Sequence, residues 1–286
     1  MKKPMICLLA AFLLLTPLMA CSQGSQSSQA PEPQPPSAQA PIAPQEPTPT
    51  PQEPTPTPTP EQPSLPEEQP EEEKEETALY IRLTGDSVNI RSGSNTQSTA
   101  LGQGEKGSMY AVKSYSGGWY AVSYKQKTAY VYDGYAKQFT LKKSDDERVE
   151  KTLEKGYFTL GTPYVYGAVR LHDGNGNLLK GFSSQKFDCS SLVQYAFYYG
   201  AGKNLGTTTR SQVKQGKYVK KSELQRGDCM FFTNADRYYN TGIERVGHVA
   251  IYLGDDYILH TSSDYARIEK MTKTRWNYYI ESRRFI

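Results

Sequence analysis

Short apolar runs separated by turn residues fill the segment from residue 79 to residue 139. The runs are rich in tyrosine, valine and isoleucine, and Gly-Ser-Asn at 93–95 and Ser-Gly-Gly at 116–118 mark two of the corners. Strands are expected over residues 80–83, 88–91, 108–115, 119–124 and 128–132. So many short strands in about sixty residues predict a small all-β barrel.

A helix is expected over residues 146–160, where a second domain begins. Ser144 or Asp145 would be its N-cap, and Gly161 would stop it. Its apolar residues recur every fourth position and therefore share one face: Val149, Leu153 and Tyr157.

A second helix is predicted with Cys189 in its first turn, because the apolar residues that follow have helical spacing. Two strands come later, over 246–254 and 257–260, joined by a Gly-Asp-Asp turn. Alternation in the first strand turns His248 away from the apolar face, and His260 ends the second strand. The sequence therefore predicts an α+β domain with two histidines on neighbouring strands.

The first twenty residues have the layout of a secretory signal, with two lysines, an apolar run and small residues before a cysteine. This stretch is too short to span a bilayer as a mature helix. Its Leu-Met-Ala-Cys ending resembles the lipobox of bacterial lipoproteins, which implies cleavage before Cys21 and lipidation of Cys21. An ordinary signal peptide with an incidental cysteine is the alternative. Either way, the protein is expected to work outside the cytoplasm.

Residues 21–76 are expected to form a disordered linker, because 16 of the 19 prolines lie between Pro31 and Pro70 with almost nothing apolar beside them. The chain has 33 basic and 30 acidic residues, a net charge of +3. Residues 77–286 carry 30 Lys and Arg against 19 Asp and Glu (+11), whereas residues 22–76 carry one Lys against 11 Glu (−10). The basic part favours an anionic polymer or surface as a neighbour. Nucleic-acid motifs and phosphate loops are absent from the sequence.

Cys189 is the candidate nucleophile. The start of a helix favours thiolate over thiol, because unpaired N–H groups and the helix dipole stabilise negative charge there. A cysteine nucleophile also needs a base, and His248 and His260 are expected on adjacent strands. One imidazole would activate the thiol and the other would orient the first ring. The third histidine of this domain, His172, is expected on the surface of a loop.

The remaining cysteine of this domain is expected to be inert. Cys229 lies in an apolar strand with Met230 and Phe231, so burial is predicted. A disulfide between Cys189 and Cys229 is the alternative to two free thiols. The spacings of cysteine and histidine match no zinc-ligand pairs, and no metal or other cofactor is expected.

Several segments together resemble the NlpC-type family of bacterial cell-wall cysteine peptidases, which are papain-like. They are Gly-Thr-Pro-Tyr-Val-Tyr-Gly at 161–167, Asp-Cys-Ser-Ser-Leu-Val at 188–193, Arg-Gly-Asp-Cys-Met-Phe-Phe at 226–232, Gly-His-Val-Ala-Ile-Tyr-Leu-Gly at 247–254 and Leu-His at 259–260. The β-rich segment, with Val-Asn-Ile-Arg-Ser-Gly at 88–93 and Gly-Gly-Trp-Tyr at 117–120, resembles the bacterial SH3-like barrels that accompany cell-wall enzymes. The resemblance implies a papain-like α+β catalytic domain, with helices on an antiparallel sheet, over 141–286, preceded by an SH3-like barrel over 77–140.

The resemblance also implies roles for the matching positions. Cys189 would be the nucleophile, His248 the general base and acid, and His260 the residue that orients His248. Tyr164 would assist the oxyanion. Residues expected to hold substrate are Asp188, Ser190, Tyr166 and Arg210. Asp188 has an alternative role as the N-cap of the helix that carries Cys189. The alternative for Arg210 is an exposed side chain in a surface turn.

Three departures from the family pattern bear on substrate preference. Ser191 stands where a glycine is usual, Tyr166 stands where a tryptophan is common, and the loop over 168–187 is longer than in compact members. Because none of these removes a catalytic atom, activity is still expected.

The activity implied by the resemblance is hydrolysis of peptidoglycan stem peptides. The bond would be the one between γ-D-glutamate and the diamino acid, diaminopimelate or lysine, with a thioester on Cys189 as intermediate. An amidase or acyltransferase on the same scaffold is one alternative, and a non-catalytic wall-binding lipoprotein is another. The SH3-like barrel would bind the wall or shape the cleft. The protein is expected to be monomeric, to bind no nucleic acid and to reach the wall from a lipid anchor at Cys21.

Overall fold

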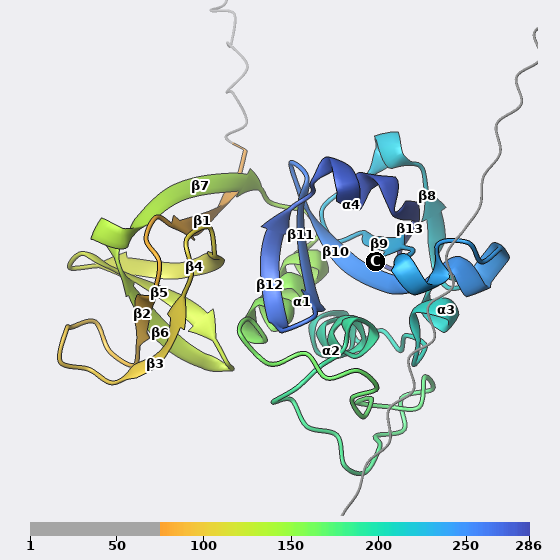
Figure 1. Ribbon diagram of the computed structural model, residues 1–286, viewed down its shortest axis with the longest axis horizontal. Helices are drawn as coiled ribbons and strands as arrows, with labels where there is room; N and C mark the ends of the chain where they lie inside the picture. Colours follow the sequence, from red (N-terminus) through yellow and green to blue (C-terminus); the bar gives the residue numbers. More distant parts are fainter. Residues whose placement is uncertain (1–74) are drawn as a thin grey trace, which may run out of the picture. The chain divides into compact units, whose positions relative to one another are not determined.

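The computed structural model describes residues 75–286. The predicted signal, Cys21 and nearly all of the predicted linker lie outside these residues. Within the part described, no helix is long and apolar enough to cross a membrane. Two antiparallel sheets follow one another along the chain, the first made by residues 77–142 and the second by residues 217–284 (Figure 1).

The first sheet has seven strands in the order β3-β2-β6-β5-β4-β1-β7. They are β1 (Thr77–Leu83), β2 (Val88–Arg91), β3 (Ala100–Gly104), β4 (Met109–Ser116), β5 (Trp119–Tyr124), β6 (Lys127–Tyr132) and β7 (Ala136–Lys142), with a 3₁₀ turn η1 (Asp133–Tyr135) before the last. The five predicted strands are confirmed as β1, β2, β4, β5 and β6. The all-β prediction for this segment is therefore correct.

Two strands of the first sheet, β3 and β7, were not predicted. β3 is rich in glycine because it crosses close to other side chains: a Cβ at Gly102 would lie 2.3 Å from the hydroxyl of Tyr124, and one at Gly104 would lie 2.4 Å from Leu83. β7 has a weak apolar pattern but pairs with β1 along its whole length. In both strands tertiary pairing, not local propensity, decides the structure.

The second sheet has six antiparallel strands in the order β12-β11-β10-β9-β13-β8. They are β8 (Lys217–Val219), β9 (Cys229–Phe232), β10 (His248–Gly254), β11 (Tyr257–Ser262), β12 (Tyr265–Lys270) and β13 (Tyr279–Arg284). Short 3₁₀ turns, η2 (Lys221–Glu223), η3 (Ala235–Arg237) and η4 (Gly242–Arg245), lie in its connections. The two strands predicted to carry histidines, β10 and β11, are neighbours in this sheet, as expected.

Helices cover both faces of the second sheet. α1 (Glu147–Phe158) and α2 (Cys189–Ala201) lie side by side on one face, while α4 (Lys273–Asn277) lies on the other; α3 (Thr209–Gln212) follows α2 (Figure 1). α1 and α2 approach closely at Gly200, where a Cβ would lie 2.2 Å from the backbone of Thr152. The predicted α+β class, with helices packed on an antiparallel sheet, is confirmed.

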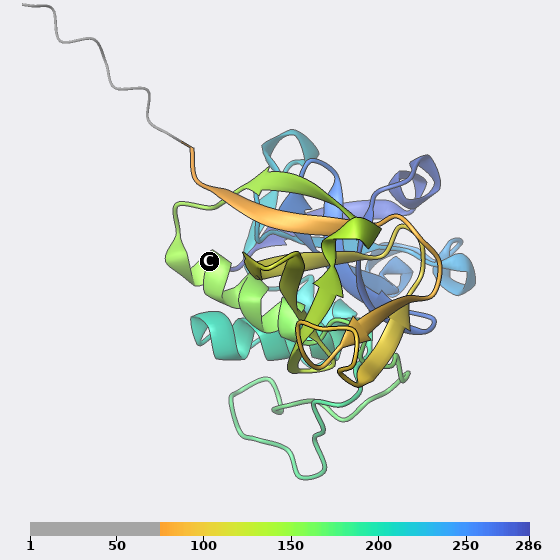
Figure 2. The same ribbon diagram turned by 90° about the vertical axis from the view of Figure 1, so that its left-hand side faces the viewer.

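The first helix begins and ends slightly differently from the prediction. Its N-cap is Asp146, whose side chain accepts from the N–H of Arg148, and not Ser144 or Asp145. It ends at Phe158, before Gly161. The carbonyls of Phe158 and Leu160 accept hydrogen bonds from the N–H groups of Gln126 and Lys125, at the turn between β5 and β6. The barrel therefore supplies part of the cap of α1 (Figure 2).

A buried polar network also joins the two sheets. The hydroxyls of Tyr80 in β1 and Tyr157 in α1 lie 2.6 Å apart. Arg226 donates to both carboxylate oxygens of Glu150, at 2.6 and 3.0 Å, to the hydroxyl of Tyr157 and to the carbonyl of Leu253. Because the Arg226 side chain is only 5% exposed, this network is part of the interior.

Candidate active site

Cys189 is the first residue of α2, directly after the N-cap Asp188. Its side chain is 8% exposed. The backbone N–H groups of Val249 and Ser190 lie against the sulfur, and both lower the pKa of the thiol. Since Val249 directly follows His248 in β10, the fold brings the helix start and the histidine strand together, as predicted.

The charge state of the sulfur differs from the expectation. Burial, followed by the negative charge of Asp188, raises the pKa of Cys189 to about 12, against the opposing effect of the two backbone N–H groups. Desolvation therefore outweighs the helix start. In the free protein the proton resides on the sulfur, so a base has to remove it when the thiol attacks.

His248 and His260 form a hydrogen-bonded pair. Nε2 of His248 lies 2.9 Å from Nδ1 of His260, and the two rings are nearly perpendicular, at 80°. His248 starts β10 and is half-buried, whereas His260 in β11 is 1% exposed. This contact leaves Nδ1 as the nitrogen of His248 that is free to accept a proton.

An acidic residue lies behind the histidine pair. Oε2 of Glu269, in β12, is 3.4 Å from Nε2 of His260, and Oε1 of Glu269 is 2.5 Å from Nη2 of Arg275 in α4. Burial alone would raise the pKa of Glu269, but His260 and Arg275 outweigh it and lower this pKa to about 2. The carboxylate is therefore ionised.

The order of these contacts determines the tautomers. At 3.4 Å the contact between His260 and Glu269 is long for a hydrogen bond, but the carboxylate still favours a proton on Nε2 of His260. Nδ1 of His260 then has a free lone pair and accepts the Nε2–H of His248. Burial lowers the pKa of His248 well below its ordinary value, with further contributions from His260 and Arg275. His248 is consequently a neutral base whose lone pair is on Nδ1.

Tyr164 lies close to this site. Its backbone N–H donates to the carbonyl of Asp264. Burial, followed by the charges of Cys189 and Asp188, raises the pKa of Tyr164 to about 12, so its hydroxyl keeps its proton at neutral pH and remains a donor. Tyr166, by contrast, is 84% exposed, and no described contact fixes its ring.

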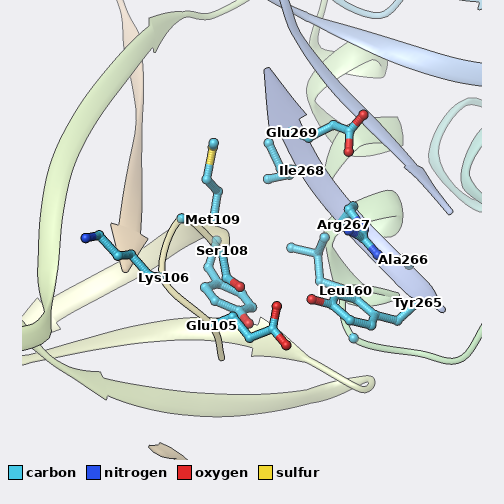
Figure 3. Close-up of a pocket in the computed structure, with 13 residues that line it drawn as sticks. Glu105, Lys106, Ser108, Met109, Leu160, Tyr265, Ala266, Arg267, Ile268 and Glu269 are labelled. Carbon is cyan, nitrogen blue, oxygen red and sulfur yellow. The ribbon is translucent and has the colours of Figure 1, made fainter. Parts of the chain in front are cut away.

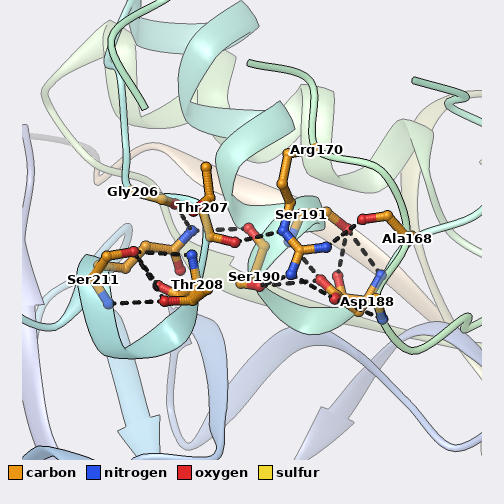
Figure 4. Close-up of polar contacts among 11 residues, drawn as sticks. Ala168, Arg170, Asp188, Ser190, Ser191, Gly206, Thr207, Thr208 and Ser211 are labelled. Carbon is orange, nitrogen blue, oxygen red and sulfur yellow. Dashed lines mark hydrogen bonds and ion pairs between the residues drawn. The ribbon is translucent and has the colours of Figure 1, made fainter. Parts of the chain in front are cut away.

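Asp188 is the N-cap of α2, one of the two roles left open by the sequence. Its Oδ1 accepts from the N–H of Ser191 at 2.9 Å, and Ser191 returns the contact in a capping box. Oδ2 of Asp188 lies 2.9 Å from Nη2 of Arg170, a residue of the loop over 168–187 (Figure 4). Ser190 donates to Asp188 at 3.1 Å and accepts from Arg170 at 3.2 Å. Asp188 and Ser190, two of the four residues expected to hold substrate, are thus part of a buried hydrogen-bond network.

Arg210 and its neighbour Gln212 have different surroundings. Arg210, in α3, lies 3.6 Å from Glu244, and its side chain is 33% exposed. Gln212 is fully buried and donates to the carbonyl of Ser190 at 2.9 Å, so it supports the segment that follows the nucleophile.

His172 does not lie on the surface, contrary to the prediction. It is fully buried, its ring lies 5.1 Å from that of Tyr198, and its Nδ1 accepts from the N–H of Gly174. The loop folds back on itself through a bridge between His172 and Leu178, and this turn carries the ring inward. Loop length alone could not predict that.

Both cysteines of the described chain are free and buried. Cys229 in β9 is fully buried, and burial raises its pKa well above the ordinary value. Within residues 75–286, no group of three or more His, Cys, Asp or Glu side chains could hold a metal ion.

A pocket lies between the two sheets, and its lining includes Glu269 but neither of the two histidines. It has a volume of about 210 Å³ and is lined by residues 105–110 of the barrel, by Leu160 and Gly161, and by residues 265–269 of β12. Figure 3 shows the carboxylate of Glu269 turned away from Lys106 and Met109. The barrel therefore forms one wall of a pocket whose other wall, β12, holds Glu269.

Sequence reasoning missed Glu269, Arg275 and Arg170. Glu269 and Arg275 belong to segments with no recognisable motif, and only strand register and α4 bring them to His260. Arg170 lies in a long polar loop. The one available signal for Arg170 was Asp188, its ion-pair partner, because a buried carboxylate next to a nucleophile needs a positively charged or hydrogen-bonding partner.

Comparison with known proteins agrees with this geometry. Residues 161–284 match the model of the NlpC/P60 family, and residues 86–137 match that of the bacterial SH3 domain. Over 137 residues the chain is 34% identical to the peptidoglycan DL-endopeptidase CwlO of Bacillus licheniformis, which covers 46% of this chain and 27% of that protein. Over 132 residues it is 30% identical to the gamma-D-glutamyl-L-lysine dipeptidyl-peptidase of Bacillus subtilis, covering 46% and 38%.

The chain thus spans less than half the length of either curated relative. Among solved structures, the peptidoglycan hydrolase RipB of Mycobacterium tuberculosis is 27% identical, with 49% of this chain and 65% of that chain covered and a TM-score of 0.38. The helix-start cysteine, the paired histidines and the two family matches lead to the same assignment: residues 161–284 form a domain of the NlpC/P60 family, preceded by a bacterial SH3 domain.

Proposed function

We propose that this chain is a cysteine peptidase that hydrolyses peptidoglycan stem peptides between γ-D-glutamate and the diamino acid. The observation that carries the proposal is the hydrogen-bonded pair of His248 and His260 beside a thiol at the start of α2. The two curated relatives support the choice of bond through their names, a peptidoglycan DL-endopeptidase and a gamma-D-glutamyl-L-lysine dipeptidyl-peptidase.

The proposed reaction begins with a neutral thiol and a neutral imidazole. Nδ1 of His248 takes the proton of Cys189 as the sulfur attacks the γ-carbonyl carbon of D-glutamate. The resulting oxyanion collapses, the C–N bond breaks, and the same proton passes to the leaving amine of the diamino acid. His248 then takes a proton from a water molecule as the water oxygen attacks the thioester carbon; the C–S bond breaks, and His248 passes this proton to the sulfur. His260 keeps the ring of His248 oriented throughout.

Tyr164 and Arg210 complete the proposed site. The neutral hydroxyl of Tyr164 is a donor for the developing oxyanion, since its pKa is raised to about 12. Arg210 and the exposed Tyr166 are proposed contacts for the rest of the stem peptide; a guanidinium suits one of its carboxylates.

The proposal extends to where the enzyme works. A lipid anchor at Cys21, a disordered linker over 21–76, a barrel over 77–140 and a catalytic domain over 141–286 would place a monomeric enzyme outside the cytoplasm, within reach of the wall. The basic balance of residues 77–286 suits an anionic wall. The barrel is proposed to shape the substrate site, because it forms one wall of the pocket that borders β12.

Digestion of purified peptidoglycan tests this function. The products are separated and their new amine termini identified by mass spectrometry, beside the Cys189→Ala variant. A new terminus on the diamino acid supports the proposal, whereas a new terminus on L-alanine would identify an amidase. Binding to the wall without any new terminus would favour the non-catalytic alternative.

The acid limb of the pH–activity profile should lie below the ordinary pKa of histidine, about 6.5. His248 has to be neutral to act as a base, and burial lowers its pKa well below the ordinary value. A base with a lowered pKa stays active as the pH falls and is lost only below that pKa. Measurement of kcat/KM for a stem tetrapeptide across the acid range checks this. An acid limb centred at pH 7 would contradict it.

Glu269→Gln should lower kcat about tenfold, because the amide no longer fixes the tautomer of His260 with a negative charge. Loss of that charge should also move the acid limb to lower pH, since Glu269 raises the pKa of both histidines. Glu281→Gln is the matched control, because Glu281 makes its own ion pair with Arg283 in the same sheet. If both variants change kcat and the acid limb equally, Glu269 has only a structural role and does not orient His260.

A further inference from the structure

We infer that Arg170 makes this site select stem peptides with an acylated N-terminus, as in the intact wall, over peptides with a free N-terminal amine. The inference rests on the proposed function and names its substrate class. Arg170 would be a specificity-determining residue, acting through the carboxylate of Asp188.

The proposed bond defines where a free amine would lie. Only L-alanine precedes the D-glutamate whose γ-carbonyl is attacked, so the nitrogen of L-alanine lies on the order of 10 Å or less from the sulfur. A peptidase that removes a dipeptide from a free N-terminus needs an anionic group there to bind the ammonium. Asp188 is the acidic side chain whose charge acts on both Cys189 and Tyr164, so it is the candidate for that group.

The carboxylate of Asp188 has no acceptor position left. Oδ1 accepts from the N–H of Ser191 at 2.9 Å and from the hydroxyl of Ser190 at 3.1 Å. Oδ2 accepts from Nη2 of Arg170 at 2.9 Å and from the N–H of Gly167 at 3.3 Å. A carboxylate offers about four acceptor positions, and all are occupied in a residue that is 4% exposed.

Arg170 is held in place from three segments. Its Nε donates to the carbonyl of Thr207 and its Nη1 to the carbonyl of Ala168, while Nη2 reaches Asp188 and Ser190 (Figure 4). The side chain is 16% exposed. Because each of these three nitrogens donates to a partner on the protein, the guanidinium is fixed beside the carboxylate and neutralises it.

A substrate ammonium would therefore meet a carboxylate that is already neutralised and has no acceptor position left. An ammonium that loses its hydration without gaining a partner binds poorly, whereas an acylated nitrogen is neutral and loses far less. In the intact wall the stem is joined to the glycan through an amide on L-alanine, so the site is suited to uncut wall and not to released peptides.

The test uses two tetrapeptides, L-alanyl-γ-D-glutamyl-diamino acid-D-alanine with a free or an N-acetylated L-alanine, each made with lysine and with diaminopimelate. At pH 6.5 the wild-type enzyme should cleave the acetylated peptide with a kcat/KM about tenfold higher. A peptide α-amino group has a pKa of about 8, so the difference should shrink towards unity by pH 9. This pH series needs no variant.

Arg170→Gln should shift the ratio about tenfold towards the free amine, and Arg170→Lys, which keeps the charge, should restore the wild-type ratio. A wild-type enzyme that prefers the free amine at pH 6.5, or whose ratio is flat with pH, overturns the inference while leaving the proposed function intact. Failure to cleave either peptide overturns both.

Discussion

Cys189→Ala is expected to abolish stem-peptide cleavage, with kcat/KM falling on the order of 10⁴-fold or more. The variant removes the atom that forms the thioester, and no other nucleophile of the described chain lies in its place at the start of α2. Folding should be preserved, because alanine is a good helix former and the cap at Asp188 does not use the sulfur. Initial rates on the acetylated tetrapeptide, with circular dichroism as the check on folding, measure the effect.

Cys229→Ala is the matched control for the nucleophile. Cys229 is the other cysteine of the described chain, also free and more deeply buried. Removal of its sulfur leaves a small cavity in the core, so a modest loss of stability is expected with activity retained per folded molecule. Equal loss of activity in the two variants would mean that Cys189 acts through packing, and the proposed mechanism would fall.

Arg226→Ala should lower the free energy of unfolding by about 3 kcal/mol, because loss of one partner from a buried pair leaves the other uncompensated. Glu150 would lose both of its charge-assisted hydrogen bonds, and the carbonyl of Leu253 and the hydroxyl of Tyr157 would each lose a donor. Urea denaturation, followed by tyrosine and tryptophan fluorescence, measures the change.

The control for Arg226 is taken from α1, the helix that carries its partner Glu150. Arg148 makes an ion pair with Asp146, but its side chain is 58% exposed. Water screens such a pair, so Arg148→Ala should lower the free energy of unfolding far less than Arg226→Ala does. If both variants unfold at the same urea concentration, the network around Arg226 contributes no more than a surface pair.

Local patterns predicted the fold well wherever burial followed a regular period. The apolar residues of α1 and the alternation around His248 were sufficient for the helix and for β10. β3 and β7 escaped because their structure depends on partners distant in the sequence, such as β1 for β7. The N-cap was displaced to Asp146 because several neighbouring residues are good caps and tertiary packing selects among them.

The sequence predicted which residues react better than it predicted the burial and the contacts that surround them. The pairing of His248 with His260 and the place of Cys189 at the start of α2, against the N–H of Val249, follow from helix and strand periods, which determine which way each side chain points. The proton on the sulfur could not be predicted, because burial depends on the whole fold. Glu269 and Arg170 were missed because strand register and the path of the loop over 168–187, and not a local sequence period, bring them to His260 and Asp188.

The hairpin turn at Lys125 and Gln126 closes the end of a helix that belongs to the other domain. A truncated protein that starts after the barrel would leave those carbonyls to solvent and strip one wall from the pocket beside β12. The barrel is thus a structural part of the catalytic domain. A different module joined in its place by recombination would have to supply a turn that caps the C-terminal end of α1 in the same way.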